Sequence, residues 1–284
     1  MEYITLSNGV KAPVIGIGTF MISPEDTENS VYSALKSGYR MIDTANAYMN
    51  EEAVGKALAK AFEEGIVTRE EVFVSTKLWP TLYENETAVD KTLERLKLDY
   101  VDLLFIHQPS GNYMAGYLQL EKAYKDGKAR SLGISNFVGE SLETLLAEAE
   151  IAPHVMQAEA HPYCTEREIR ERITEYGTAL MGWYPLGHGD PGLVKEPVFT
   201  KFADKYCKSN AQIVLRWHTQ MGFMTIPGSR NPDHIRANFD IFDFTLTDEE
   251  MAEIAKLDGT KRYYVADEET VAKYAELHLP FEKE

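Results

Sequence analysis

Eight short apolar runs alternate with longer amphipathic segments, and this alternation restricts the fold more than any other feature of the sequence. Each run begins about 25 to 45 residues after the previous one, the length of a strand, a helix and two short loops. The runs lie at residues 12–20, 39–44, 71–77, 100–108, 129–137, 155–162, 178–187 and 223–229. This pattern predicts a (β/α)8 barrel of the α/β class, and a doubly wound open sheet is the alternative.

Amphipathic segments between the runs are predicted to be helices, because their apolar residues recur three and four positions apart. The predicted helices cover residues 28–37, 51–64, 84–96, 117–125, 140–149, 166–176 and 211–220. A further helix is predicted to begin at the sequence TDEE, with Thr247 as N-cap and Glu250 at the third helical position. No linker or low-complexity segment interrupts the chain, so we expect one domain over residues 1–284.

The charge balance excludes some functions. The 284 residues include 29 Lys and Arg against 45 Asp and Glu, a net charge of −16. Such a chain is not expected to bind nucleic acid or an anionic membrane non-specifically, and an anionic ligand would need a local cationic site. No stretch is apolar enough to span a bilayer, and the start MEYITLSNGV lacks a basic segment followed by an apolar core. We therefore expect a cytoplasmic protein.

Cysteine and histidine give little sign of a metal site. Cys164 and Cys207 are far apart, and no CxxC pair occurs. The sequence HPYC places His161 near Cys164, but a second ligand pair at zinc spacing is missing. We expect no metal.

Polar or aromatic residues stand where the apolar runs end. They are Asp43, Lys77, His107, Ser135 with Asn136, Gln157 and Trp183. In a (β/α)8 barrel the functional groups lie at the carboxyl ends of the strands. Six such endings in succession are not easily explained by packing alone, so we expect these side chains to form a site.

Six segments together resemble the aldo-keto reductase family. They are GYRMIDTANAYMNEEAVGKAL, VSTKLW, DLLFIHQP, GKARSLGISNF, MQAEAHPY and IPGSRNPDHIRANF, and the resemblance covers nearly the whole chain. It implies a barrel with an N-terminal β-hairpin and a C-terminal loop over the barrel mouth. It also implies reduction of aldehydes and ketones with a nicotinamide cofactor, and it places the catalytic tetrad on Asp43, Tyr48, Lys77 and His107.

The proposed chemistry requires these residue types. A carbonyl that accepts a hydride becomes an alkoxide and needs a proton donor, here Tyr48. A tyrosine is a reluctant donor near neutrality, and a nearby ammonium, here Lys77, is predicted to lower its pKa. Asp43 can hold Lys77 in place, and His107 can orient the carbonyl oxygen. Taken singly, each residue would be read as structural; the case for catalysis rests on all four together.

The cofactor is expected to bind without a Rossmann motif, because GIGTF at residues 16–20 lacks the third glycine and the following helix. The resemblance implies that Ser135, Asn136 and Gln157 hold a carboxamide and that Trp183 stacks on a nicotinamide. The remaining predicted cofactor residues at the mouth are Gly18, Thr19, Phe20, Leu186 and Gly187.

The segment expected to meet the extra phosphate of NADPH departs from the family pattern. Gly228 replaces a lysine, and His234 stands where an arginine is expected, while Ser229 and Asn238 keep their places. Arg230 can either bind a phosphate or be a solvated loop charge. We expect NADPH as cofactor, with NADH possible.

The substrate pocket is predicted to involve Phe20, Trp79, His107, Asn112 and Tyr113, with Met21 and the aromatic tail 261–281 as further candidates. An aromatic wall suits small aldehydes, dicarbonyls and keto sugars. We expect a small-molecule carbonyl as the partner, no nucleic acid or membrane, and a monomer or weak homodimer.

Two other functions are open from the sequence. Lys77 at a strand end is also compatible with a Schiff-base lyase, although pairing with Asp43 would keep it protonated. A non-catalytic nicotinamide-binding subunit that senses redox state for a partner is the second alternative.

Overall fold

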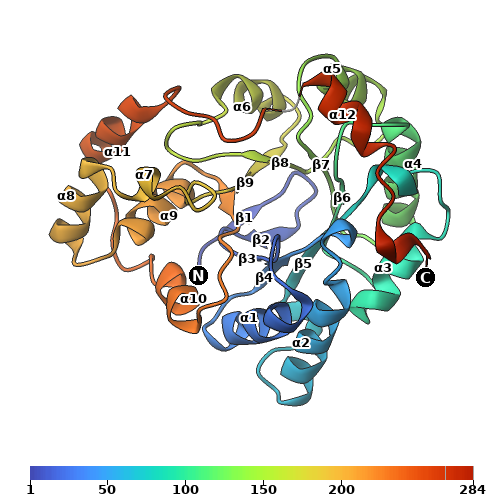
Figure 1. Cartoon of the computed structure of the whole chain (residues 1–284), viewed down its shortest axis with the longest axis horizontal. Helices are drawn as coiled ribbons and strands as arrows, with labels where there is room; N and C mark the ends of the chain where they lie inside the picture. Colours follow the sequence, from blue (N-terminus) through green and yellow to red (C-terminus); the bar gives the residue numbers. More distant parts are fainter. Residues whose placement is uncertain (266, 284) are drawn as a thin grey trace.

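The computed structural model describes residues 1–265 and 267–283, and eight parallel strands form its centre (Figure 1). The strands are β3 (Ile17–Gly18), β4 (Met41–Asp43), β5 (Phe73–Leu78), β6 (Leu103–Ile106), β7 (Leu132–Ser135), β8 (Val155–Glu159), β9 (Ala179–Trp183) and β10 (Met224–Thr225). They follow one another from β3 to β10, and a parallel bridge between Ile15 and Thr225 joins the two ends. The sheet is therefore closed, which confirms the predicted (β/α)8 barrel; the open-sheet alternative is wrong.

Helices surround the sheet, as Figure 1 shows. They are α1 (Pro24–Lys36), α2 (Glu51–Glu63), α3 (Ala88–Leu96), α4 (Tyr113–Lys125), α5 (Gly139–Glu148), α6 (Arg167–Thr174), α7 (Pro191–Val194), α8 (Pro197–Tyr206), α9 (Asn210–Gln220), α10 (Pro232–Phe239), α11 (Asp248–Ile254) and α12 (Glu268–Tyr274). Each of the seven predicted segments contains a helix, with ends shifted by a few residues. The capping box of Thr247 and Glu250 at the start of α11 is confirmed.

Strand geometry explains why one set of side chains lies inside the barrel. Successive side chains on a strand point to opposite faces, so every second residue faces the axis. On β5, Phe73 belongs to the inner apolar cluster and Val74 to the layer between strands and helices. The same alternation places the Lys77 side chain inside the barrel, four residues after Phe73. On β4 and β8 it places Asp43 and Gln157 inside, two residues after the inward Met41 and Val155.

An N-terminal hairpin covers the amino-terminal end of the barrel. Strands β1 (Tyr3–Thr5) and β2 (Lys11–Pro13) pair antiparallel. Leu6 and Ala12, from the turn and second strand, share an apolar cluster with inward residues at the starts of the barrel strands. The predicted hairpin is therefore present, and it closes the amino-terminal end of the barrel.

The C-terminal segment lies at that opposite end. The indole Nε1 of Trp79 donates to the carbonyl oxygen of Leu277 over 2.9 Å, and the hydroxyl of Ser110 donates to the carbonyl oxygen of Val271. Both donors follow strand ends, which confirms the predicted C-terminal loop over the mouth. A covered mouth limits the access of water to whatever binds beneath.

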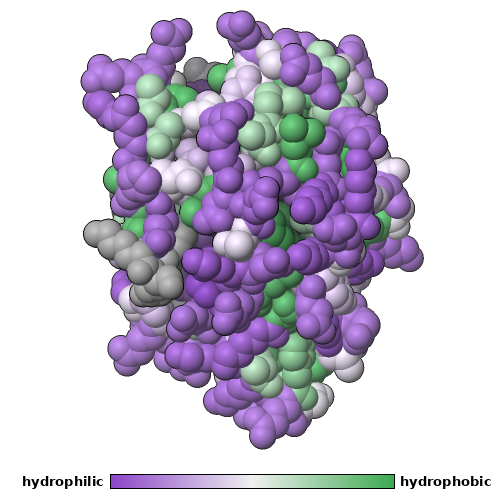
Figure 2. Space-filling view, turned by 90° about the vertical axis from the view of Figure 1, so that its right-hand side faces the viewer, coloured by the Kyte–Doolittle hydropathy of each residue, from purple (hydrophilic) through white to green (hydrophobic). Residues whose placement is uncertain are grey.

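The face in Figure 2, which is the right-hand side of Figure 1, is largely hydrophilic, with hydrophobic residues in scattered groups. This agrees with the net charge of −16. Over the described ranges 1–265 and 267–283, no helix has the length and hydropathy that a membrane span requires.

Candidate active site

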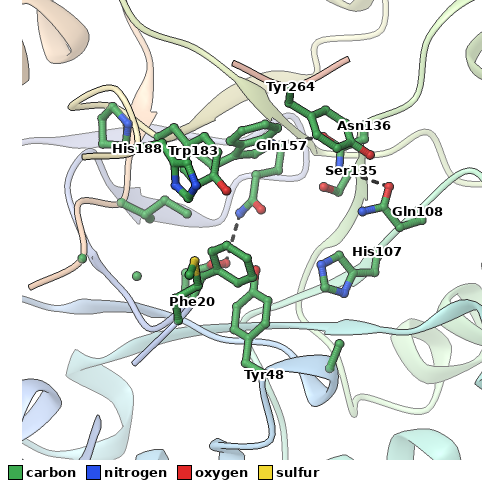
Figure 3. Close-up of a pocket in the computed structure, with 18 of the residues that line it drawn as sticks. Phe20, Tyr48, His107, Gln108, Ser135, Asn136, Gln157, Trp183, His188 and Tyr264 are labelled. Carbon is green, nitrogen blue, oxygen red and sulfur yellow. Dashed lines mark hydrogen bonds between the residues drawn. The ribbon is translucent and has the colours of Figure 1, made fainter. Parts of the chain in front are cut away.

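A cavity of about 530 Å³ opens at the carboxyl-terminal end of the barrel (Figure 3). Residues from strand ends, from the loops that follow them and from the C-terminal segment line it. They are Gly18, Phe20, Met21, Asp43, Ala47, Tyr48, Trp79, His107, Gln108, Ser135, Asn136, Gln157, Trp183, Tyr184, Pro185, Leu186, His188, Gly189, Ile226, Pro227, Gly228, Tyr264, Tyr274, Leu277 and Leu279. The lining is mostly apolar and aromatic with a few polar groups, the usual character of a small-molecule site.

A buried ion pair forms the floor of this cavity. Nζ of Lys77 donates to Oδ2 of Asp43 over 2.6 Å and to the carbonyl oxygen of Thr44 over 2.8 Å. The other oxygen of Asp43 accepts from Ser75 over 2.7 Å and from Gln157 over 3.1 Å. Burial lowers the pKa of Lys77 below its ordinary value, and the contact with Asp43 opposes this shift.

These contacts bear on the Schiff-base alternative. The Lys77 side chain is fully buried, and its ammonium faces a carboxylate and a carbonyl oxygen. A nucleophilic lysine needs a neutral amine with access to the substrate. The arrangement instead suits a fixed positive charge beneath the cavity.

Tyr48 stands above this ion pair on the short 3₁₀ turn η1 (Asn46–Tyr48). Its ring lies 5.1 Å from Nζ of Lys77 and packs edge-on against His107, with 5.6 Å between ring centroids. Figure 3 shows both rings facing the same space. The site therefore brings together all four residues predicted as a tetrad.

The predicted direction of the Tyr48 pKa is wrong. Burial raises this pKa well above its ordinary value, and Asp43 and Tyr184 add to the rise. The physical reason is burial, which disfavours the charged phenolate; the Lys77 charge that was expected to lower the pKa is paired with Asp43 at 2.6 Å. Tyr48 is thus a protonated phenol over the physiological pH range, a form that can donate a proton.

His107 is a neutral imidazole in this site. Burial lowers its pKa well below the ordinary value, and the positive charge of Lys77 lowers it further. Its Nδ1 is buried, with no hydrogen-bond partner among the residues that the structure describes. A neutral ring has one N–H donor and one acceptor nitrogen, so His107 can donate a hydrogen bond without carrying charge.

Asn50 connects three parts of the site, and sequence reasoning did not single it out. Its Nδ2 donates to the carbonyl oxygens of Thr19 and Ile22 over 3.0 and 3.1 Å and to the hydroxyl of Thr27 over 3.2 Å. Its Oδ1 accepts from the hydroxyl of Thr44 over 2.8 Å. The Thr44 carbonyl in turn holds the Lys77 ammonium. The loop before α1, the η1 turn and the ion pair are therefore tied to one side chain.

The predicted carboxamide-holding residues come together on the wall opposite Tyr48 (Figure 3). Nε1 of Trp183 donates to Oδ1 of Asn136 over 3.0 Å, and Nδ2 of Asn136 donates to Oε1 of Gln108 over 3.2 Å. Gln157 contacts Asp43 through its Nε2 alone. The hydroxyl of Ser135 and the Oε1 of Gln157 thus remain for a ligand amide within the described part of the chain. Polar groups beside an aromatic plane fit a nicotinamide ring.

The residues predicted at the outer end of the cofactor site are more widely separated than the predicted carboxamide-holding residues. Gly18, Phe20, Leu186 and Gly228 line the cavity. Thr19 is fully buried, and its hydroxyl donates to the carbonyl oxygen of Asp43 over 3.2 Å.

The other outer residues lie beyond the cavity. Gly187 forms a turn with φ +78°, and Ser229 caps a turn through Asn231. Arg230 and His234 are exposed, and Asn238 is buried on α10. A guanidinium nitrogen of Arg230 lies 3.4 Å from Oδ2 of Asp26.

The predicted substrate residues divide into two groups. Phe20, Trp79 and His107 line the cavity. Asn112 instead caps α4, where its Oδ1 accepts from the backbone N–H of Ala115 over 3.2 Å. Tyr113 packs against Phe137, 5.3 Å between ring centroids. A role for these two in substrate binding is not supported by their position.

Several lining residues were missed from the sequence. Gln108 and Tyr184 each follow a predicted site residue directly, so their place in the chain was the available signal. Tyr264, Tyr274 and Leu277 come from the aromatic tail, which was expected at the mouth only as a whole. Glu159 fixes this tail, because its two carboxylate oxygens accept from the backbone N–H groups of Tyr263 and Tyr264 over 2.6 and 2.7 Å.

Metal-ligating side chains do not gather anywhere in residues 1–265 and 267–283: no group of three or more His, Cys, Asp or Glu could hold an ion.

The sequence of this chain matches the model of the Aldo/keto reductase family over residues 14–191 and 192–259. The chain belongs to this family. It is 44% identical to a glyoxal reductase of Bacillus subtilis (strain 168) over 266 residues, which cover 92% of the chain and 94% of the relative. It is 39% identical to the methylglyoxal reductase DkgA of Escherichia coli (strain K12), with 91% and 94% covered.

Solved structures agree with the family assignment. The crystal structure of a Bombyx mori aldo-keto reductase in complex with NADP superposes on this reductase with a TM-score of 0.88 and 34% identity, and covers 96% of the chain and 98% of its own. Family membership makes the chain an oxidoreductase that acts on carbonyl compounds.

Proposed function

We propose that this chain, acting as one domain over residues 1–284, reduces aldehydes and ketones to alcohols with NADPH and with Tyr48 as the proton donor. The observation that carries the proposal is the protonated Tyr48 and the neutral His107 facing one cavity above the Asp43–Lys77 pair. The family and the solved relative with NADP support the reaction class and the cofactor.

In the proposed reaction, a bound reduced nicotinamide would supply the hydride. The chain's own residues handle the oxygen and the proton. The hydroxyl of Tyr48 donates a hydrogen bond to the carbonyl oxygen and then transfers its proton as negative charge develops there. Although the pKa of Tyr48 is high, an alkoxide is a far stronger base than a phenolate, so the transfer is downhill.

His107 and the ion pair support Tyr48 in different ways. A neutral imidazole N–H gives the carbonyl oxygen a second donor and fixes its direction. Once Tyr48 has lost its proton, the buried ammonium of Lys77, 5.1 Å from the ring centroid, stabilises the phenolate. Asp43 keeps this ammonium in place through the 2.6 Å contact.

The cofactor would lie between Trp183 and the Ser135 and Gln157 side chains, which offer an aromatic plane, a hydroxyl and an amide oxygen. Arg230 is a nearby cation for a phosphate, although it already pairs with Asp26 at the surface. We therefore propose NADPH as the preferred cofactor, by a modest factor over NADH.

Small α-dicarbonyls are the proposed substrates. Two relatives of this chain are named for α-dicarbonyl substrates, one as a glyoxal reductase and one as a methylglyoxal reductase. The similarity to each extends over more than 90% of this chain. The cavity, at about 530 Å³, has room for a small carbonyl beside a nicotinamide ring.

The test is to follow nicotinamide absorbance with purified protein, NADPH and NADH in parallel, and a panel of small aldehydes, dicarbonyls and keto sugars. Carbonyl-dependent oxidation, faster with NADPH, is the expected result. Measurable cofactor binding without oxidation in the presence of any carbonyl would contradict the proposal and favour the redox-sensing alternative.

A further inference from the structure

Gln108 lies beside His107 in the cavity and is 7% exposed. Its backbone is fixed by a single hydroxyl: the N–H of Gln108 donates to Oη of Tyr83 over 3.0 Å, and Oη donates to the Gln108 carbonyl oxygen over 2.8 Å. Tyr83 is itself 1% exposed. The main chain at position 108 is thus rigidly placed before the side chain is considered.

A chain of three hydrogen bonding groups fixes the orientation of the Gln108 amide. The indole nitrogen of Trp183 is a donor only, so the atom that it meets on Asn136 is the oxygen. The Asn136 amide therefore presents its nitrogen to Gln108, and the atom that accepts is the Gln108 oxygen. The usual ambiguity between the two ends of an amide is removed at both residues.

This arrangement leaves the side-chain nitrogen of Gln108, Nε2, as a hydrogen-bond donor. With Oε1 of Gln108 turned towards Asn136, its Nε2 is left on the cavity side, as Figure 3 shows. Among the described residues, the Gln108 side chain makes its hydrogen bond to Asn136 through Oε1, and Nε2 has no hydrogen-bond partner. The group has two N–H donors beside the imidazole that would orient the reacting carbonyl.

We propose that Gln108 is a specificity-determining residue that donates a hydrogen bond from Nε2 to a second oxygen on the substrate, next to the carbonyl that is reduced. This inference rests on the proposed function. It selects α-dicarbonyls and α-hydroxycarbonyls over simple aldehydes of the same size, because a simple aldehyde offers no second acceptor to Nε2 on this buried side chain.

The test compares methylglyoxal with propanal, two aldehydes with the same three-carbon chain, of which only methylglyoxal has a second carbonyl. kcat/KM is measured with NADPH for the wild type, Gln108→Leu and Gln108→Glu. Gln108→Leu removes the donor and also the acceptor for Asn136. Gln108→Glu keeps an acceptor for Asn136 and removes the donor, so it separates the two roles.

The expected result is a roughly tenfold fall in the ratio of kcat/KM for methylglyoxal to that for propanal in both variants, because any effect of a changed Asn136 contact on cofactor binding acts on the two aldehydes alike. Hydration of methylglyoxal in water is the same for every variant and cancels in the comparison between them.

Other outcomes would overturn the inference. An unchanged ratio in both variants, or a wild-type ratio in Gln108→Glu with a fall in Gln108→Leu alone, would show that Gln108 only positions Asn136. A rise in the KM for NADPH in Gln108→Glu, which keeps the acceptor for Asn136, without a change in the ratio would assign Nε2 to the cofactor. A wild type that oxidises NADPH with neither aldehyde would refute the proposed function as well, which distinguishes the two failures.

Discussion

The inner and outer ends of the cavity differ in how their polar groups are held. At the inner end, Lys77, Asp43 and Asn50 are almost completely buried and each meets several partners. At the outer end, the Arg230 side chain is 70% exposed and pairs with Asp26 at the surface over 3.4 Å. A buried polar group without a partner costs free energy, so the polar side chains at the inner end adopt one hydrogen-bonded arrangement. At the outer end, solvent can satisfy the polar side chains in many arrangements.

This difference suggests a division of roles. The inner end keeps the proposed proton donor in a fixed position, which a reaction common to many carbonyls needs. The outer end contributes affinity for the proposed cofactor, and substitution of a single exposed charge can change this affinity. Substitutions should therefore have large effects at the inner end and small ones at the outer end.

The largest effect is expected for Lys77→Met. The substitution leaves the Asp43 carboxylate buried without its cation, so we expect a loss of about 3–5 kcal/mol in the free energy of unfolding, measured by urea denaturation. Adding Asp43→Asn removes the orphaned charge, and the double variant should regain part of this loss. A double variant that is less stable than Lys77→Met would contradict the account of the ion pair.

Asn50→Leu should have the next largest effect. It removes the donor and acceptor groups that join Thr19, Ile22, Thr27 and Thr44, and leaves these groups unsatisfied. We expect a loss on the order of 2–4 kcal/mol in the free energy of unfolding and a lower kcat in the folded fraction.

The control for Asn50 is Asn29→Ala on the exposed face of α1, which should change stability by less than about 0.5 kcal/mol. If Asn50→Leu were as stable and as active as this control, the hydrogen bonds of Asn50 would not be what ties the loop before α1 to the η1 turn and the ion pair.

The pH dependence distinguishes the structure from the expectation based on sequence. Because the pKa of His107 is lowered and that of Tyr48 raised, neither group changes its charge near neutrality. We expect kcat/KM to be nearly constant between about pH 6 and pH 9. Activity that falls as the pH rises from about 7 to 9 would instead indicate loss of a proton in this range, either from a Tyr48 with a lowered pKa, as the sequence suggested, or from Lys77, whose pKa burial lowers.

The smallest effect is expected at Arg230. Arg230→Ala should reduce the ratio of kcat/KM with NADPH to that with NADH by no more than about fivefold, because an exposed pair contributes less than about 1 kcal/mol. His234→Arg adds a cation on the exposed side of α10 and should raise the same ratio. A change of a hundredfold or more in either variant would show that the outer end is as fixed as the inner one.

The barrel and its inward residues could be predicted because they follow from local periodicity. Each apolar run contained a strand. Because side chains alternate along β5, an inward-facing Phe73 implies that Lys77, four residues later, also faces inward. The short helices α8 and α10 were missed, although a proline at the first turn of each and the Asn231 cap of α10 were readable signals.

Other features depended on contacts between distant segments. The donor of Gln108 is oriented through Asn136 and Trp183, which lie on other strand ends, and Tyr264 reaches the cavity because Glu159 holds its backbone. The pKa of Tyr48 was predicted in the wrong direction for the same reason. The sequence shows that a lysine paired with Asp43 is near, but not that the folded chain buries the phenol and so raises its pKa.

The proposed role of Tyr48 is to donate the proton, while the hydrogen bonds of Asp43, Lys77 and Gln157 form without the Tyr48 hydroxyl. The most direct test is Tyr48→Phe, with NADPH binding measured by fluorescence and turnover by absorbance on the same preparation. We predict unchanged cofactor binding and a fall of roughly 10²–10⁴ in kcat. A Tyr48→Phe variant that keeps wild-type turnover would contradict the assignment.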